Sequence, residues 1–396
     1  VFSNSLDYKY LDLEKYYKYR DKVKLISKEE FYENPDDVVI FLNTDSYAYL
    51  THTFYRSGFK HMYCMRSLAK NLLSLNLIEK KQKGFDEYDL NNDIAIVTFE
   101  QTFDSMYQRY QLYRDNSEIN KKYTAVGYGD VGTGYTGETF ADEIYKLKTT
   151  NTFDADLKTL MDYANETLPW KPIKDAILIS DFDNGYSNTD IIGSLSNKPH
   201  YGTGSMEGSL GGGDSGGAAF INGLIAGIAS YTAAIGPTAT AGDIDDEINS
   251  SYGEIAGYQR VSYNQEFIDK TVRQNYPDAP KTKDEVKKVV DEDDIYAYFM
   301  LEYLPLRNSV DDIISVNYKT IDGTAIAGVD YIATSGQLNL YKDESYAIIA
   351  IELLDDNIKE SNEYFSLQVS DPNYGSFGDG VVTLTAIRTI VDDDFF

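Results

Sequence analysis

The sequence predicts an all-β protein with more than one domain, and three observations support this prediction. Short apolar runs bounded by Gly, Asp and Asn recur along the chain, as they do in small antiparallel sheets. Residues 275–288 contain two prolines and several charges, which predicts a linker between two β-rich parts. The length of 396 residues is enough for two or three domains that each bury a core.

The composition limits the class of partner. A formal net charge of −28 argues against nucleic acid or an anionic membrane surface as the main partner, and it favours cations. Hydrophobic residues make up 42% of the chain, which excludes wholesale disorder, and no apolar run reaches the roughly eighteen residues that span a bilayer. The single cysteine, Cys64, excludes an internal disulfide framework, so packed cores and bound ions are the expected sources of stability.

The first part of the chain, up to about residue 91, has a mixed pattern. Val38–Leu42 predicts a short buried strand, and Met62–Lys81, with leucines spaced among lysines, predicts a partly amphipathic helix. Asn91–Val97 then combines a polar start with an apolar strand, and Asp93 stands at the entrance of that strand. By itself, an aspartate in this place is most often a turn residue that bonds its own backbone.

A glycine-rich stretch, Gly211–Gly217, is the feature around which the rest of the chain is organised. It precedes an apolar run over Ala218–Ser230, and it places Ser215 between glycines and next to a carboxylate. This arrangement suits a nucleophile held on a tight turn, with backbone N–H groups facing its substrate. A flexible turn is the alternative, because glycines mark turns far more often than active sites.

Other elements are predicted on both sides of this stretch. Ala176–Ser180 predicts a short apolar strand. The dipeptide Asn222-Gly223 separates two apolar runs and predicts a hairpin directly after the glycines. Ser262 and Gln265 have the spacing of a capping box, and the apolar residues that follow predict a helix over Tyr263–Gln274.

Three motifs together resemble the chymotrypsin-like (trypsin-like) serine proteases. Gly213-Asp214-Ser215-Gly216-Gly217 resembles the nucleophile motif of that family, and Asn92-Asp93-Ile94-Ala95 resembles the segment that carries its orienting aspartate. Gly127-Tyr128-Gly129 resembles the opening of the second barrel. The motifs occur in the family's order over roughly Asp93–Tyr276. The resemblance implies a double β-barrel with a C-terminal helix, whose first barrel is expected to be truncated at its N-terminus.

The same resemblance implies a role for each matching residue. Ser215 would be the nucleophile, Asp93 would orient the catalytic histidine, and the N–H groups of Gly213 and Ser215 would form the oxyanion hole. Ser209, Ser230 and Thr232 would shape the primary specificity pocket. Because Ser209 is small and neutral and Thr232 stands where the family usually has glycine, we expect cleavage after small or medium apolar residues.

The catalytic base is the missing part of this resemblance. The chain contains only His52, His61 and His200, and none lies in the Thr-Ala-Ala-His-Cys context that the family uses. His52 has about the family's separation from Asp93, His61 resembles a non-catalytic histidine of the family, and His200 follows Asp93, which is the wrong order. The chain opens at Val1 without a signal peptide pattern, and we expect the base to precede Val1, with His52 and a natural pseudo-protease as alternatives.

The last hundred residues predict a small antiparallel sandwich. The predicted strands are Ile295–Leu304, Ile313–Tyr318, Tyr346–Leu353, Tyr364–Val369 and Val381–Ile390. Carboxylates are bunched at the turns between these strands rather than scattered. If the strands bring these turns to one end, a hard cation such as Ca²⁺ must offset the like charges. A solvated acidic surface that keeps the protein soluble is the alternative.

This acidic sandwich resembles a Calx-β domain. The resemblance is carried by Asp322–Ala325, Gly328–Tyr331, Leu354–Asn357 and the terminal run of aspartates, and it covers nearly all of Asp291–Phe396. It implies the calcium ligands Glu292, Asp330, Asp355, Asp356, Glu360, Asp392, Asp393 and Asp394, with Glu363 as a further candidate.

The sequence is therefore interpreted as a secreted serine endopeptidase, acting outside the cell or at its surface on a protein or peptide. The protease domain is predicted at residues 1–276, a linker at 277–288 and a calcium-binding Calx-β domain at 289–396. The alternative is an inactive protease homologue that acts as a calcium-dependent binding or adhesion protein. The intact glycine turn and Asp93 favour the enzyme.

Overall fold

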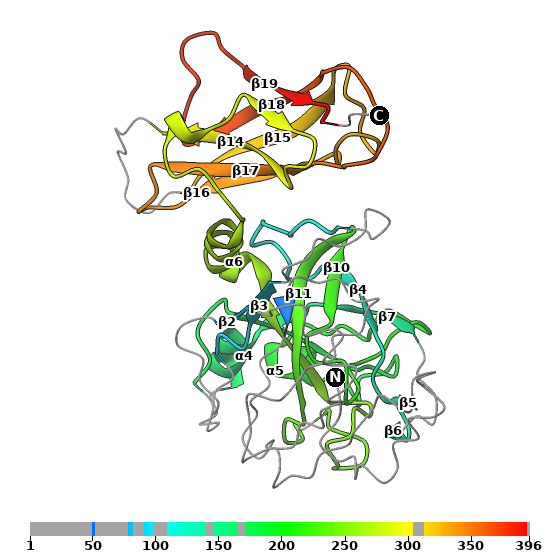
Figure 1. The fold of residues 1–396 in the computed structure, drawn as a ribbon. Helices are drawn as coiled ribbons and strands as arrows, with labels where there is room; N and C mark the ends of the chain where they lie inside the picture. The colour runs from blue at the N-terminus through cyan, green and yellow to red at the C-terminus, as the bar shows by residue number, and fades with distance from the viewer. Residues whose placement is uncertain are drawn as a thin grey trace, which may run out of the picture. The chain divides into compact units, whose positions relative to one another are not determined.

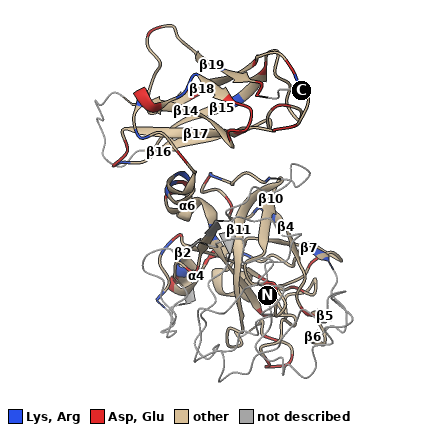
Figure 2. Cartoon of the chain, viewed as in Figure 1, with Lys and Arg blue, Asp and Glu red and all other residues tan. Residues whose placement is uncertain are grey.

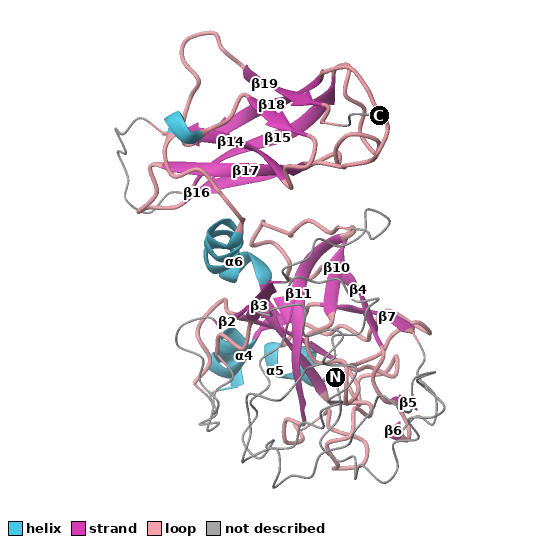
Figure 3. Cartoon of the chain, viewed as in Figure 1, coloured by secondary structure: helices cyan, strands magenta, loops and turns pink. Residues whose placement is uncertain are grey.

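The computed structural model describes residues 50–51, 78–81, 91–98, 109–139, 146–164, 171–238, 240–303 and 313–393. The chain divides into two compact units, each described separately below (Figure 1). Unit 1 comprises Val1–Phe103 and Tyr107–Phe267, and unit 2 comprises Asp104–Met106 and Ile268–Phe396. Strands predominate in both units, which confirms the all-β class (Figure 3). No helix among the described residues is long and apolar enough to cross a membrane.

Unit 1 is built on an antiparallel sheet of seven strands in the order β7-β4-β10-β11-β12-β9-β8. These strands are β4 (Lys122–Gly127), β7 (Leu147–Thr152), β8 (Ala155–Asp156), β9 (Ile177–Asp181), β10 (Ala218–Ile221), β11 (Leu224–Ala233) and β12 (Ile255–Arg260). The predicted strand at Ala176–Ser180 is confirmed as β9. The predicted double barrel remains a prediction.

Both faces of this sheet are covered, which explains why strands β9 and β12 are buried along their whole length. All five residues of β9 are buried. Ile177 and Ile179 pack in one core cluster, whereas Leu178 packs in a second cluster with Tyr123 and Phe153. Alternate side chains of a strand point to opposite faces, so a strand between two cores shows no polar alternation.

A second sheet of unit 1 has the order β1-β3-β2, with strands β1 (Leu50–Thr51), β2 (Ile78–Lys81) and β3 (Ala95–Thr98). The predicted helix over Met62–Lys81 is wrong at its end, because Ile78–Lys81 pairs antiparallel with β3. Ladder hydrogen bonds to β3 override a weak helical pattern there. The rest of that predicted helix, and the predicted strand at Val38–Leu42, lie outside the described residues. A separate hairpin joins β5 (Val131–Thr133) to β6 (Gly137–Thr139).

The predicted hairpin between β10 and β11 is confirmed. Asn222 and Gly223 have φ of 51° and 81°, and positive φ at both central residues matches a tight type I′ turn.

The helices of unit 1 include α4 (Leu157–Ala164) and α5 (Ile191–Ser196), and α6 (Val261–Asn275) follows β12. Helix α6 confirms the predicted helix over Tyr263–Gln274. The predicted capping box is wrong, because the helix already begins at Val261. The Ser262 hydroxyl instead donates to Glu118 Oε1 at 2.6 Å. Glu118 is fully buried and also accepts from Arg260, so this carboxylate competes for the serine.

Unit 2 is a sandwich of two sheets, one with the order β13-β19-β18-β15-β16 and one formed by β14 and β17. Its elements are η4 (Lys283–Glu285), β13 (Val289–Asp291), β14 (Tyr296–Glu302), β15 (Ile314–Asp322), β16 (Ser335–Leu340), β17 (Tyr346–Glu352), β18 (Glu363–Asn373) and β19 (Thr383–Val391). All five predicted strands are present, whereas β13 and β16 were not predicted. Inward-facing residues form one core, in which Tyr331 and Phe365 stack at 4.4 Å between ring centroids.

Candidate functional site

The glycine-rich stretch forms a compact turn that is tied to β11. Gly213 and Gly216 have φ of 100° and 83°, a conformation that favours glycine. Gly216 N–H donates to the carbonyl of Ala229 at 2.9 Å, and Ala229 N–H donates to the carbonyl of Gly217 at 2.8 Å. Among the described residues, the N–H groups of Gly213 and Ser215 have no hydrogen-bond acceptor. Two donors of this turn are therefore left for another acceptor.

Asp214 is held in a cradle made by two segments of unit 1. Its Oδ1 accepts from Gly129 N–H at 2.7 Å, and its Oδ2 accepts from Gly211 N–H at 2.9 Å. A Cβ on Gly127 or Gly129 would lie 2.0 or 2.7 Å from this carboxylate, so both positions require glycine. Burial raises the pKa of Asp214, and the backbone N–H donors oppose that rise.

Asp93 is fully buried at the entrance to β3. Its Oδ2 accepts a hydrogen bond of 2.6 Å from the hydroxyl of Ser230, which lies in β11. Gln259 Nε2 of β12 donates to the same hydroxyl at 3.4 Å. Asn91 anchors this segment, since its side chain bonds the backbone of Lys171 and Ile173. The sheet of β3 and the seven-stranded sheet thus meet at Asp93 and Ser230.

Only one of the three histidines lies among the residues that the structure describes. His52 and His61 lie outside the described residues, although Thr51, which precedes His52 in sequence, is the Cα partner of Ala95. His200 is half-buried, and its Nδ1 lies 3.1 Å from Asp154 Oδ1. The hydrogen bond with Asp154 raises the pKa of His200. His200 is therefore paired with Asp154, and its exclusion as the base remains a prediction.

A cavity of about 260 Å³ lies beside the glycine turn. Its lining includes Ser209, Gly129 and Asp214. Of the residues predicted to shape the specificity pocket, Ser209 lines this cavity, whereas Ser230 and Thr232 do not. The cavity therefore lies on the Asp214 side of the turn, and the predicted pocket remains a prediction.

Strand topology gathers the acidic turns of unit 2 at one end of the sandwich. Strand β13 runs parallel to β19, so Glu292 and Asp392 follow strands that end side by side. The start of β18 pairs with the end of β19, with Glu363 opposite Ile390. Leu354 N–H donates to the carbonyl of Asp330 at 3.0 Å, which brings that loop to the end of β17. Figure 2 shows acidic residues on the loops at the end of unit 2 where the C-terminus lies.

Three carboxylates of this end converge closely enough to share one ion. Asp330, Glu360 and Glu363 each offer an oxygen within 4.8 Å of the others; Asp330 is buried and Glu360 is exposed. Burial and the charges of Asp330 and Glu360 raise the pKa of Glu363 to about 7. Glu363, the first residue of β18, was predicted only as a further candidate ligand.

The other predicted ligands lie around this group. Burial, together with the nearby charges of Asp356, Asp355, Asp392 and Glu360, raises the pKa of Glu292 to about 7. Asp392 Oδ2 accepts from Glu360 N–H at 2.8 Å. Asp393 is exposed, and Asp394 lies outside the described residues. The crowding that was expected from the sequence is therefore present for Glu292, Asp355, Asp356, Glu360 and Asp392.

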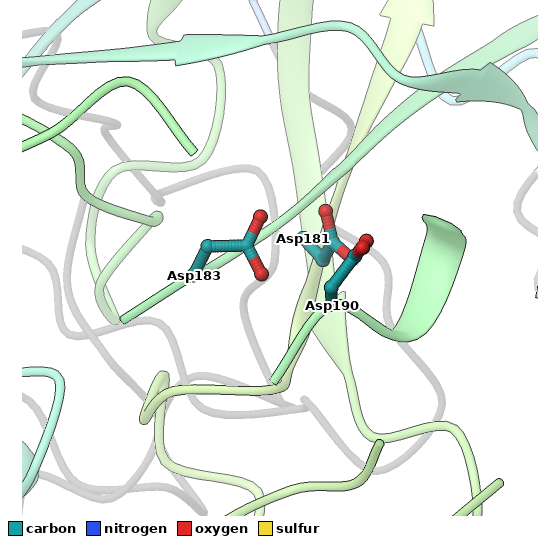
Figure 4. A group of neighbouring side chains, drawn as sticks. All are labelled: Asp181, Asp183 and Asp190. Carbon is teal, nitrogen blue, oxygen red and sulfur yellow. The ribbon is translucent and has the colours of Figure 1, made fainter. Parts of the chain in front are cut away.

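A second carboxylate group, which the sequence analysis missed, lies in unit 1. Asp181, Asp183 and Asp190 place oxygens within 4.8 Å of one another, and all three are buried (Figure 4). The available signal was two aspartates spaced by one residue at the end of β9, followed by a third just before α5.

Comparisons with known proteins concern the C-terminal part. The family model described as the Calx-beta domain matches residues 285–394. The sodium/calcium exchanger Calx of Drosophila melanogaster is 33% identical over 88 residues, which are 22% of this chain and 9% of the exchanger. The chain thus matches less than a tenth of that relative's length.

Solved structures are similar to the same part. The apo-form Calx CBD1 domain is 27% identical, with a TM-score of 0.23, over 28% of this chain and 94% of that one. The calcium binding domain CBD12 of CALX1.1 is 28% identical, with a TM-score of 0.24, over 27% of this chain and 41% of that one. The family match and the observed sandwich show that residues 285–394 contain a Calx-beta domain.

Proposed function

We propose that the Calx-beta domain of this chain binds Ca²⁺ at the acidic end of its sandwich. The observation that carries the proposal is the convergence of Asp330, Glu360 and Glu363 within 4.8 Å. Ca²⁺ takes about six to eight oxygen ligands, and crowded carboxylates supply such ligands. The similarity to a sodium/calcium exchanger supports the same choice of ion.

Electrostatics distinguishes this proposal from a merely solvated acidic surface. Charges spread evenly over a surface leave each carboxyl near its ordinary pKa, whereas the pKa values of Glu292 and Glu363 are both raised to about 7. Such groups resist ionisation because they are partly buried and because their neighbours are negative. A divalent cation would relieve that repulsion and stabilise the ionised form.

The test is hydrogen exchange of the full chain, with and without millimolar Ca²⁺, followed in peptides from residues 326–331 and 353–365. Ca²⁺ should slow exchange there by at least tenfold. Glu360→Gln should reduce this protection. Asp379→Asn, a change at an exposed carboxylate in the β18–β19 loop, should leave it intact. Equal exchange in Ca²⁺ and in chelator would leave only the solvated-surface interpretation.

A second candidate function concerns unit 1, which we infer to be a serine endopeptidase. The favouring observation is the 2.6 Å hydrogen bond from Ser230 to the buried Asp93, because an orienting aspartate must be buried and held. In this mechanism Asp93 would accept Nδ1–H of the catalytic histidine and stabilise the imidazolium. Ser215 would attack the scissile carbonyl, and Gly213 and Ser215 N–H would hold the oxyanion. Their lack of an acceptor among the described residues supports that role.

The histidine of this mechanism has two candidate positions, either before Val1 or at His52. The pairing of Thr51 with Ala95 supports His52, because it places the segment before that histidine beside the strand that follows Asp93. The alternative function is a binding or adhesion protein whose unit 1 is inactive. Action outside the cell on a protein or peptide remains a prediction.

A fluorophosphonate probe tests the enzyme, because it labels only an activated serine. We expect the 396-residue chain to be labelled slowly or not at all, and a chain extended with the upstream coding sequence to be labelled readily. Ser215→Ala should remove all labelling. Fast labelling of the 396-residue chain that His52→Ala abolishes would assign the base to His52. An unlabelled extended chain would favour the binding protein.

A further inference from the structure

The carboxylate cluster of unit 1 is a separate place where the fold gathers negative charge. Asp181 is the last residue of β9, and Asp183 follows it by two residues, just beyond the end of the strand. Asp190 is the N-cap residue of α5, and its Oδ1 accepts from Gly193 N–H at 2.8 Å. Figure 4 shows the carboxylate of Asp183 directed toward Asp181 and Asp190.

Protein donors satisfy only part of this cluster. Asp181 Oδ2 accepts from Ile192 N–H at 2.7 Å, and Asp190 Oδ2 accepts from His200 N–H at 3.0 Å. Asp183 is only 4% exposed, yet neither of its oxygens has a hydrogen-bond donor within the described part of the chain. A buried carboxylate without a partner is costly, so this side chain points to a ligand that supplies positive charge.

Other negative charges face the cluster and increase its need for a positively charged ligand. Asp154 and Glu207 interact electrostatically with Asp183, as does Asp190. His200, whose Nδ1 is bonded to Asp154, opposes these charges when its ring is protonated. No lysine or arginine among the described residues forms an ion pair with Asp181, Asp183 or Asp190.

We propose that Asp181, Asp183 and Asp190 bind a Ca²⁺ ion that is distinct from the site in the Calx-beta domain. All three ligands are carboxylate oxygens, which select a hard cation. Oxygens that bind one Ca²⁺ at about 2.4 Å can lie no more than about 4.8 Å apart, and the three oxygens here lie within that limit. Mg²⁺ demands a tighter octahedron and gives up its waters reluctantly, so a buried site with three carboxylates favours Ca²⁺.

An ion at this position would connect two elements of unit 1. It would join the end of β9 to the start of α5, which are the first elements of the segment that leads to the glycine turn. Glu207, near the end of that segment, accepts from Asp183 N–H at 2.8 Å. Ca²⁺ would therefore order residues 181–207, and the effect would be local to unit 1.

Hydrogen exchange of the full chain tests the proposal, because peptides from residues 177–210 report this site separately from peptides of the Calx-beta domain. We expect millimolar Ca²⁺ to slow exchange in 177–210 by at least tenfold relative to chelator. Asp183→Asn should abolish that response while leaving the Ca²⁺-free protein at least as protected as wild type, because the change removes repulsion and keeps the shape. Asp246→Asn, at an exposed carboxylate, should respond as wild type does.

Three outcomes would overturn the proposal. One is unchanged exchange of residues 177–210 in Ca²⁺. Another is an undiminished response in Asp183→Asn. The third is protection by Mg²⁺ or Mn²⁺ without protection by Ca²⁺, which would contradict the choice of ion. Protection of β10–β12 in every sample establishes that the variants are folded, and its loss in Asp183→Asn would contradict the predicted tolerance of that change.

Discussion

The Ser230 hydroxyl donates a hydrogen bond of 2.6 Å to Asp93 Oδ2, although 137 residues separate the two positions. The bond joins β11 of the large sheet to the entrance of β3, and both residues are buried. Removing this donor takes a partner from a buried carboxylate.

Ser230→Ala should therefore destabilise unit 1 by about 1–3 kcal/mol, the usual penalty for depriving a buried acceptor of its donor. Urea unfolding measures this change, and Ser205→Ala, at an exposed serine, should be neutral. If unit 1 is a peptidase, the variant should also slow fluorophosphonate labelling of the competent chain. An unchanged unfolding free energy would contradict the importance of the bond.

Gly129→Ala should displace the carboxylate of Asp214 from its present position. The new Cβ would lie 2.7 Å from Asp214 Cγ, so the carboxylate would have to move away from its hydrogen bond with Gly129 N–H. We expect a loss of about 1–3 kcal/mol, typical of overpacking at a tight site. Gly236→Ala is the matched control, because Gly236 is exposed and a Cβ there meets nothing within 4 Å. Equal thermal stability of the two variants would contradict the claim that position 129 requires glycine.

Asp355→Asn combined with Asp356→Asn should remove most of the thermal stabilisation that Ca²⁺ gives to the Calx-beta domain. Both charges lie near Glu292, and a ligand that binds only the folded form stabilises it by mass action. At about one hundred times the dissociation constant, wild type should gain about 2.7 kcal/mol. Calorimetry of the full chain with Ca²⁺ and with chelator measures this gain. A full shift in the double variant would exclude these residues as ligands.

Glu138→Gln should change how stability depends on pH. Burial raises the pKa of Glu138, and its Oε2 accepts from Gly212 N–H. Since the folded pKa lies above the unfolded value of 4.5, the folded form binds the extra proton. The contribution of Glu138 to stability is thus complete below pH 4.5 and is lost as the pH rises through the folded pKa.

Glutamine keeps an acceptor for Gly212 N–H and does not ionise, so the variant should gain stability relative to wild type as the pH rises through that window. Urea unfolding of both proteins at several pH values gives this difference. A difference that stays constant with pH would mean that Glu138 does not titrate in the folded protein as expected.

Much of the fold could be predicted from the sequence because the signals were local. Asn222-Gly223 predicts its hairpin through the positive φ that both residues tolerate, and α6 follows from helical spacing over Tyr263–Gln274. Strand β16 escaped prediction because Ser335–Leu340 alternates weakly and begins with polar residues. Strand β2 was mistaken for helix because pairing with β3 decides its conformation.

The sequence by itself determined where carboxylates are concentrated, and therefore predicted the acidic end of the sandwich. Only the tertiary structure decided which carboxylates converge. Asp330 meets Glu360 and Glu363 through strand pairing, and Asp183 meets Asp190 because α5 begins beside the end of β9. Convergence depends on packing between segments that are distant in the chain. Composition and periodicity report only neighbours along the chain, so these contacts could not be read from the sequence.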